Sequence, residues 1–139
     1  VLAQHQVYYP TFYPQPGFAE QDANEILAAV ITGLKTIESQ IDLSKAVALA
    51  FSSAMHSVVA VNKKCETLTP LIIWADTRSS AQAKELRHTV AGVELHQQNG
   101  TPIHPMSPLC KLMWLRANEP ELHSQAYKFI SIKEFVWYH

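Results

Sequence analysis

The stretch AVALAFSSAMHSVVAV, residues 46–61, decides the fold. Its first part, 46–52, is nearly all apolar and short, which predicts a strand covered on both faces. Two serines and the pair Met55-His56 interrupt the apolar run before it resumes at 58–61. In open α/β sheets, ligands bind beyond the carboxyl ends of the strands. The stretch therefore predicts a strand that ends at a binding site.

Helical and strand patterns alternate on both sides of this stretch. Residues 1–9 alternate loosely and suggest a strand, and 9–18 form a loop broken by three prolines and a glycine. Asp22, with Glu25 as capping-box partner, begins an amphipathic helix over 23–40. Helices interleaved with short strands indicate an α/β layer structure. The other expected elements are strands at 58–61, 71–74 and 129–132, with the first two in a hairpin-like excursion, and helices at 79–91, 93–98, 109–117, 121–126 and 134–139.

The composition excludes several classes of protein. The 139 residues are 47% hydrophobic and 17% charged, as in one globular domain with a real core. The net charge is −1 and the basic residues are scattered, so we expect no nucleic-acid partner and no membrane-surface patch. No apolar stretch approaches the roughly 20 residues that span a bilayer. Cys65 and Cys110 lie far apart and are expected to be reduced thiols of a cytoplasmic protein.

Several catalytic motifs are absent from the sequence. There is no G-x-x-x-x-G-K-[ST] or G-x-G-x-x-G motif, and the four glycines are dispersed, so we expect no complete nucleotide site in this segment. The seven histidines lack metal-ligand spacing, and there is no H-E-x-x-H or C-x-x-C. A serine hydrolase is disfavoured because no G-x-S-x-G elbow is present. Metal and triad chemistry are therefore not expected.

Two polar stretches on apolar scaffolding are candidates for chemistry. His56, beside Met55, can donate or accept a hydrogen bond near neutral pH, although a structural histidine is the alternative. In IIWADTRSS, Trp74 supplies an apolar wall, and Asp76 and Arg78 lie two residues apart where a helix starts. The alternative is that Asp76 only caps that helix and Arg78 only pairs with it.

A third stretch, GTPIHPMSPLCKL, places His104 and Met106 on a loop that three prolines stiffen. A rigid loop that holds polar groups suits a binding site. The alternative is a loop that only connects two helices.

Together these stretches resemble the FGGY family of carbohydrate kinases. PGFAEQDANEI, SSAMHSVVAV, LIIWADTRS and KFISIKEFVW follow the order and spacing of the family, over essentially the whole chain. Within the family, SSAMHS, WADTRS and GTPIHPMSPLCKL look most like the gluconate kinases. The resemblance implies an α/β, ribonuclease H-like (actin-like ATPase) fold. It also implies that 1–139 is part of an N-terminal domain truncated at both ends, without the first phosphate-binding hairpin and without the C-terminal domain.

The resemblance also implies which residues form the sugar site. His56 would bind substrate hydroxyls, and Asp76 and Arg78 would shape the wall and lid of the pocket. Gluconate carries a carboxylate, which needs a cation or several N–H donors, so we expect Lys133 and His104 at its carboxylate end. The implied substrate-binding residues are Met55, His56, Trp74, Asp76, Arg78, His104, Met106, Lys133 and Glu134.

For the parent enzyme, the resemblance implies ATP-dependent phosphorylation of gluconate to 6-phosphogluconate, with Mg²⁺ on the phosphates. The general-base aspartate and the cofactor site would lie outside this segment, which would be inactive alone. A kinase for xylulose, ribulose, glycerol or another polyol is one alternative, and a non-catalytic binding module is another. Exposed sheet edges would favour self-association, as in a homodimer.

Overall fold

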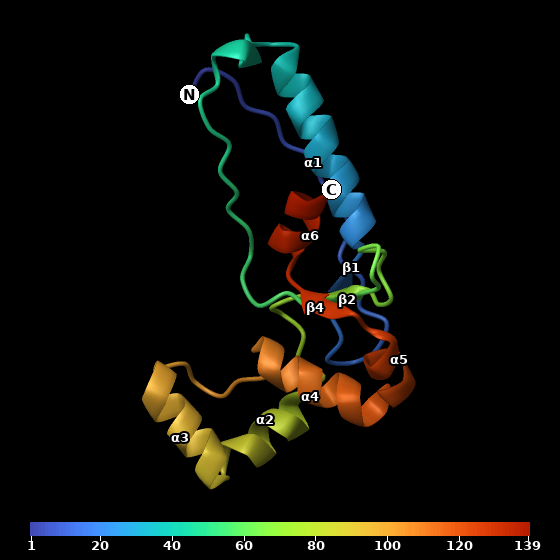
Figure 1. Cartoon of the computed structure of the whole chain (residues 1–139), viewed down its shortest axis with the longest axis vertical. Helices are drawn as coiled ribbons and strands as arrows, with labels where there is room; N and C mark the ends of the chain where they lie inside the picture. Colours follow the sequence, from blue (N-terminus) through green and yellow to red (C-terminus); the bar gives the residue numbers. More distant parts are fainter.

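The protein is described by a computed structural model over residues 1–139, in which short strands and helices alternate (Figure 1). No helix combines the length and the apolar character that crossing a membrane requires. The elements in chain order are β1 (Glu20–Gln21), α1 (Ala23–Glu38), the 3₁₀ turn η1 (Leu43–Lys45), β2 (Val59–Val61), β3 (Leu71–Ile72), α2 (Ser80–Arg87), α3 (Val90–Asn99), α4 (Pro108–Asn118), α5 (Pro120–Gln125), β4 (Lys128–Ile130) and α6 (Ile132–Tyr138).

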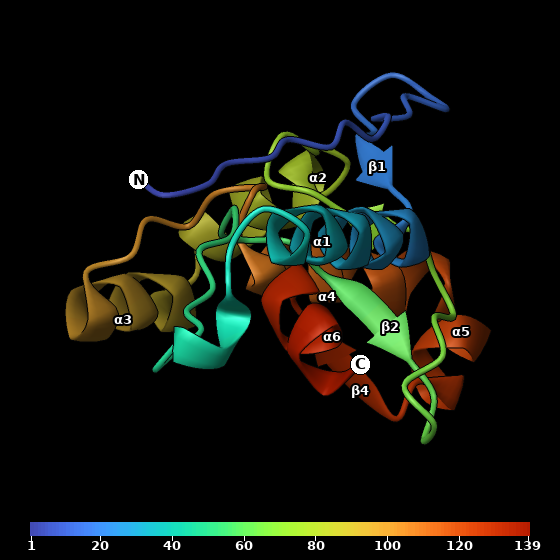
Figure 2. The same cartoon turned by 90° about the horizontal axis from the view of Figure 1, so that it is seen from above.

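Two antiparallel strand pairs form the centre of the molecule. β1 pairs with β3, and β2 pairs with β4 in the register Ala60 to Phe129. A bridge between Val58 and Ile72 links the two pairs, so the expected hairpin-like excursion is confirmed. α1 and α6 lie side by side on one side of the strands, whereas α2, α4 and α5 lie on the other (Figures 1 and 2).

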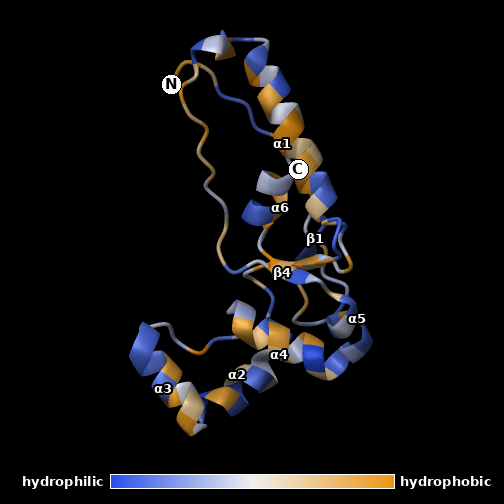
Figure 3. Cartoon of the chain, in the orientation of Figure 1, coloured by the Kyte–Doolittle hydropathy of each residue, from blue (hydrophilic) through white to orange (hydrophobic).

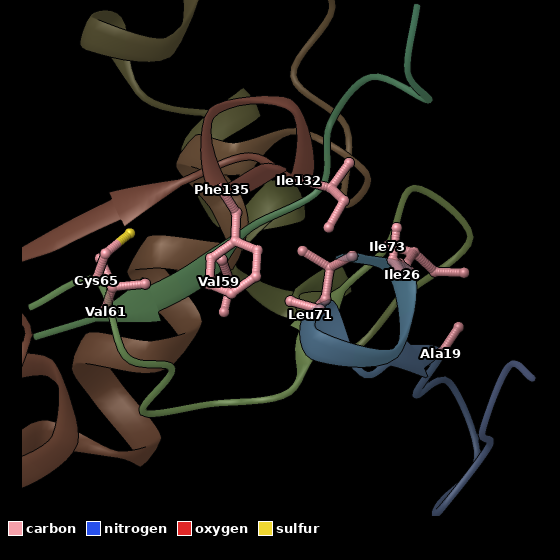
Figure 4. Close-up of a cluster of buried hydrophobic side chains, with 10 residues drawn as sticks. Ala19, Ile26, Val59, Val61, Cys65, Leu71, Ile73, Ile132 and Phe135 are labelled. Atoms are coloured by element: carbon pink, nitrogen blue, oxygen red, sulfur yellow. The ribbon is translucent and has the colours of Figure 1, made fainter. Parts of the chain in front are cut away.

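The hydrophobic core fills the space between the strands, α1 and α6. The aromatic ring of Phe135 on α6 is completely buried among β2 and β3 side chains, and Ile26 contributes the inward face of α1 (Figure 4). Burial of these apolar surfaces holds α1 and α6 against the strands. The buried cluster comprises Ala19, Ala23, Ile26, Val59, Val61, Cys65, Leu71, Ile73, Ile132 and Phe135.

The strands expected at 1–9 and 46–52 are wrong. Residues 46–50 are exposed, and the side chain of Val47 is fully exposed. Apolar residues therefore remain uncovered along this extended segment (Figure 3). An apolar run becomes a strand only when a neighbouring segment completes its backbone hydrogen bonds, and no segment within 1–139 pairs with 46–52.

The helix starts depend on local caps. α1 begins as predicted, because the Asp22 carboxylate accepts a hydrogen bond from the Asn24 N–H at 2.7 Å; it ends at Glu38, and no Glu25 capping bond is formed. Two helices are expected here, over 79–91 and 93–98, but the break between them comes earlier, because α2 ends at Arg87 and α3 runs from Val90 to Asn99. His88 is the C-cap of α2, and Thr89 is the N-cap of α3, because its hydroxyl oxygen accepts from the Gly92 N–H. A side chain that satisfies a free N–H in this way favours a new helix start.

Candidate functional site

A cavity of about 410 Å³ lies between α1, the 51–57 segment, β3 and α6. Its volume suits a small molecule. Three of the predicted site residues line it: Met55, Trp74 and Lys133. Its walls are mainly apolar, and Ser52 and Ser53 add hydroxyl groups.

The Met55-His56 pair lies in a turn, and only the first of its two residues lines the cavity. The side chain of Met55 lines the cavity and is 72% exposed. His56 is half-buried and does not line the cavity, and its φ of 68° lies in the left-handed region. That conformation is costly for a residue with a Cβ atom, so surrounding contacts must hold it.

A buried lysine that the sequence analysis missed supplies one of these contacts. The side chain of Lys111, on α4, is completely buried. Its ammonium group donates to the His56 carbonyl oxygen and, at 2.8 Å, to the Ile73 carbonyl oxygen. Burial lowers the pKa of Lys111 to about 8, although the nearby Asp76 carboxylate opposes the shift. The sequence signal that could have indicated its burial is helical spacing, since Lys111 lies four residues before the buried Leu115 and so on the same face of α4.

Asp76 and Arg78 form the expected ion pair, but neither side chain lines the cavity. The Arg78 Nε donates to both carboxylate oxygens of Asp76 at 3.0 Å, and Nη2 donates to Glu20 at 2.5 Å. Asp76 also accepts from the Ala19 N–H at 2.7 Å. The guanidinium lies 3.8 Å from the ring centre of Phe18, a cation–π contact. This buried cluster fastens residues 18–20 to the start of α2.

The loop that carries His104 and Met106 lies outside the cavity lining. The backbone N–H of Met106 donates to the Nδ1 of His104 at 3.2 Å, which stabilises a local turn. The Ser79 hydroxyl donates to the Pro105 carbonyl, and Arg87 donates to the Ile103 carbonyl, both at 2.9 Å. These bonds tie the loop to α2, and the imidazole of His104 remains exposed.

Lys133 and Glu134 lie in the first turn of α6 and make different contacts. Lys133 lines the cavity, and its side chain is 53% exposed. Glu134 completes a capping box, since its carboxylate accepts from the Ser131 hydroxyl and from the Ser131 N–H at 3.0 Å. The Ser131 hydroxyl bond lowers the pKa of Glu134. The Lys133 ammonium lies 3.5 Å from the Glu134 carboxylate, so the two side chains form an exposed ion pair in the first turn of α6.

Residues 1–139 match the N-terminal domain of the FGGY family of carbohydrate kinases. The chain is 39% identical over 137 residues to a gluconokinase of Bacillus subtilis. This alignment covers 99% of the chain and 27% of that relative. It is 28% identical over 138 residues to a xylulose kinase of Staphylococcus xylosus, and this alignment covers 99% of the chain and 29% of that relative. The chain thus spans about a quarter of the length of the curated relatives it matches.

Solved structures give the same picture. A gluconate kinase from Lactobacillus acidophilus superimposes with a TM-score of 0.88 at 34% identity, covering 94% of this chain and 26% of that chain. A ligand-bound xylulose kinase from Lactobacillus acidophilus gives the same values. A xylulose kinase from Brucella ovis superimposes with a TM-score of 0.86 at 25% identity, covering 93% of this chain and 26% of that chain.

Proposed function

Since the chain belongs to the FGGY family of carbohydrate kinases, we propose that it forms part of a sugar-binding site. The chain has the α/β, ribonuclease H-like fold of the family's N-terminal domain. The resemblance and the fold expected from the motifs are thereby confirmed. We propose further that the complete natural protein transfers the γ-phosphoryl group of ATP to a hydroxyl of a sugar or sugar acid.

The observation that carries the proposal is the cavity that brings Met55, Trp74 and Lys133 together. Trp74 is 57% exposed and offers an apolar wall on which the carbon face of a sugar can lie. The hydroxyls of Ser52 and Ser53 can exchange hydrogen bonds with sugar hydroxyls. Such a site orients the acceptor, and phosphoryl transfer depends mainly on positioning and electrostatics.

We propose D-gluconate as the acceptor, with 6-phosphogluconate as the product. Lys133 is the cationic side chain in the cavity lining, and its ion pair with Glu134 is exposed. Arg78 is buried between Asp76 and Glu20 and does not line the cavity. A lysine in the cavity lining suits the carboxylate that distinguishes gluconate from a neutral polyol. His104, which lies outside the cavity, stays a predicted second contact to that carboxylate. The gluconokinases among the relatives support this choice, and the xylulose kinases keep a neutral sugar as the alternative.

ATP and Mg²⁺ would be bound mainly by residues outside this chain. No three metal-ligating side chains come together within 1–139, and the chain has no glycine cluster to cradle phosphates. We therefore derive no catalytic step from these residues beyond binding and orienting the acceptor. It follows that the chain alone should release no ADP. A cytoplasmic location and a homodimer stay predictions.

The test is ADP release by the complete natural protein with Mg-ATP and either D-gluconate, D-xylulose, D-ribulose, glycerol or no sugar. We expect turnover with D-gluconate alone. Turnover with a neutral polyol instead would refute the carboxylate contact, and no turnover with any acceptor would favour a non-catalytic binding module.

Variants of Lys133 and His104 test the two predicted contacts to the carboxylate. Lys133→Met should raise the KM for D-gluconate at least tenfold, because the carboxylate loses its cation. Lys128→Met is the matched control, since Lys128 is exposed on β4 and does not line the cavity. His104→Ala should raise the KM for D-gluconate far more than the KM for ATP; equal effects on both would refute its role.

A further inference from the structure

The buried ammonium group of Lys111 joins the two segments that present Met55 and Trp74 to the cavity. Its acceptors are the carbonyl oxygen of His56, one residue after Met55, and that of Ile73, one residue before Trp74. Lys111 itself does not line the cavity. The lysine therefore acts on the cavity only through the backbone of these two segments.

An ammonium group is well suited to this position. It has three donors and no acceptor, so one group can serve two carbonyl oxygens that point toward it. Hydrogen bonds from a charged donor are stronger than neutral ones, and a left-handed residue such as His56 keeps its conformation only if its surroundings hold it. Asp76 and Arg78 are the charged residues that act on the ammonium group: the Asp76 carboxylate favours its charged form, and the Arg78 guanidinium opposes it.

We propose that Lys111 is a positioning residue of the sugar cavity, whose ammonium group fixes the Met55-His56 turn against Ile73 and so sets how Met55 faces Trp74. The inference rests on the proposed function, because it assigns the cavity to the acceptor. Its effect is on the shape of the cavity and not on the cofactor. Loss of the ammonium group should therefore weaken binding of the acceptor and leave binding of ATP unchanged.

The experiment compares Lys111→Leu with Lys84→Leu in the complete natural protein. Lys84 is the control because it is exposed on α2, away from the cavity. We expect Lys111→Leu to raise the KM for D-gluconate at least tenfold, with the KM for ATP within twofold, and Lys84→Leu to change neither. A lowered kcat with an unchanged KM for D-gluconate would overturn the proposal.

A second readout needs no sugar and separates this inference from the proposed function. The ¹³C-methyl NMR signal of Met55 should shift or broaden in Lys111→Leu and stay in place in Lys84→Leu. If the wild-type protein phosphorylates no sugar, the proposed function fails, but the Met55 signal still tests Lys111. An unchanged Met55 signal in a folded Lys111→Leu variant would overturn the inference.

The wild-type protein provides the test if Lys111→Leu does not fold. The ¹³Cε signal of Lys111 reports its own titration, whose midpoint we expect near pH 8. The Met55 methyl signal should follow the same midpoint, because the turn is held by this ammonium group. A Met55 signal that is constant through that titration would overturn the proposal.

Discussion

Replacing Asp76 by asparagine should loosen the attachment of residues 18–20 to α2. The Asp76 carboxylate is completely buried and accepts hydrogen bonds from Arg78 and from the Ala19 N–H. Asparagine keeps the shape but loses the charge, and its amide NH₂ would face the donors of Arg78. Arg78, whose side chain is 5% exposed, would then keep only Glu20 as an anionic partner.

The magnitude follows from burial. Removing one partner of a buried ion pair costs about 3–5 kcal/mol, because a charge is left without its partner in a site that water does not reach. Glu20 still neutralises Arg78, so we expect the lower end of this range, about 3 kcal/mol. At about 1.4 kcal/mol per factor of ten, the opening equilibrium of this cluster should increase roughly 100-fold.

Hydrogen exchange of the Ala19 amide measures this local opening directly in the complete natural protein. We expect exchange to be roughly 100-fold faster in Asp76→Asn and about tenfold faster in Glu20→Gln, which removes one bond to a charged donor. Glu85→Gln is the control, because Glu85 is exposed on α2 and should change exchange by less than about twofold. An Asp76→Asn variant with Ala19 exchange within threefold of wild type would refute the reasoning.

Three further predictions test other parts of the structure. The pKa of Lys111 is about 8 in the folded protein and 10.5 in the unfolded chain, so above pH 8 the unfolded state binds more protons than the folded state. Stability therefore rises with pH in this range. Urea unfolding should show the wild-type protein gaining about 1 kcal/mol from pH 8 to pH 9 relative to Lys111→Leu. Gly92→Ala should destabilise by about 1–3 kcal/mol in urea unfolding, since its Cβ would lie 1.9 Å from a backbone oxygen, whereas Gly33→Ala, with open space around it, should stabilise α1 by about 0.5–1 kcal/mol. Ser57→Ala should accelerate exchange of the Ile132 amide about tenfold, because its hydroxyl oxygen accepts from that N–H at 3.1 Å; unchanged exchange would contradict this cap.

Local signals predicted the elements that depend on local interactions. α1 follows its cap at Asp22, and β2, β4 and most helices lie where periodicity placed them. The segment 46–52 failed because a strand needs a partner from elsewhere in the fold, which apolar composition does not specify. The break between α2 and α3 was predicted too late in the sequence, after residue 91, because the hydroxyl bond of Thr89 already competes with continuation of the helix.

Part of the cavity lining and one ion pair were predictable from the motifs, whereas the role of the cavity as a sugar site stays a prediction. Met55, Trp74 and Lys133 do meet at one cavity, and the two-residue spacing of Asp76 and Arg78 does give an ion pair. Lys111 was missed, because a lone lysine in a helix is usually solvated and its burial depends on carbonyl groups far away in the sequence.

The apolar run is interrupted at Met55-His56 because a turn is needed there, and not because a strand ends there as the sequence predicted. Three consecutive residues use the turn: Met55 lines the cavity, the His56 carbonyl accepts from Lys111, and the Ser57 hydroxyl accepts from the first N–H of α6. In a continuous strand the His56 carbonyl would point into a ladder, and Lys111 would lose one acceptor. A left-handed residue here keeps that carbonyl available while the side chains on either side reach the cavity and the helix that carries Lys133. The turn thus connects the cavity lining with α4 and α6, which an uninterrupted strand would not do.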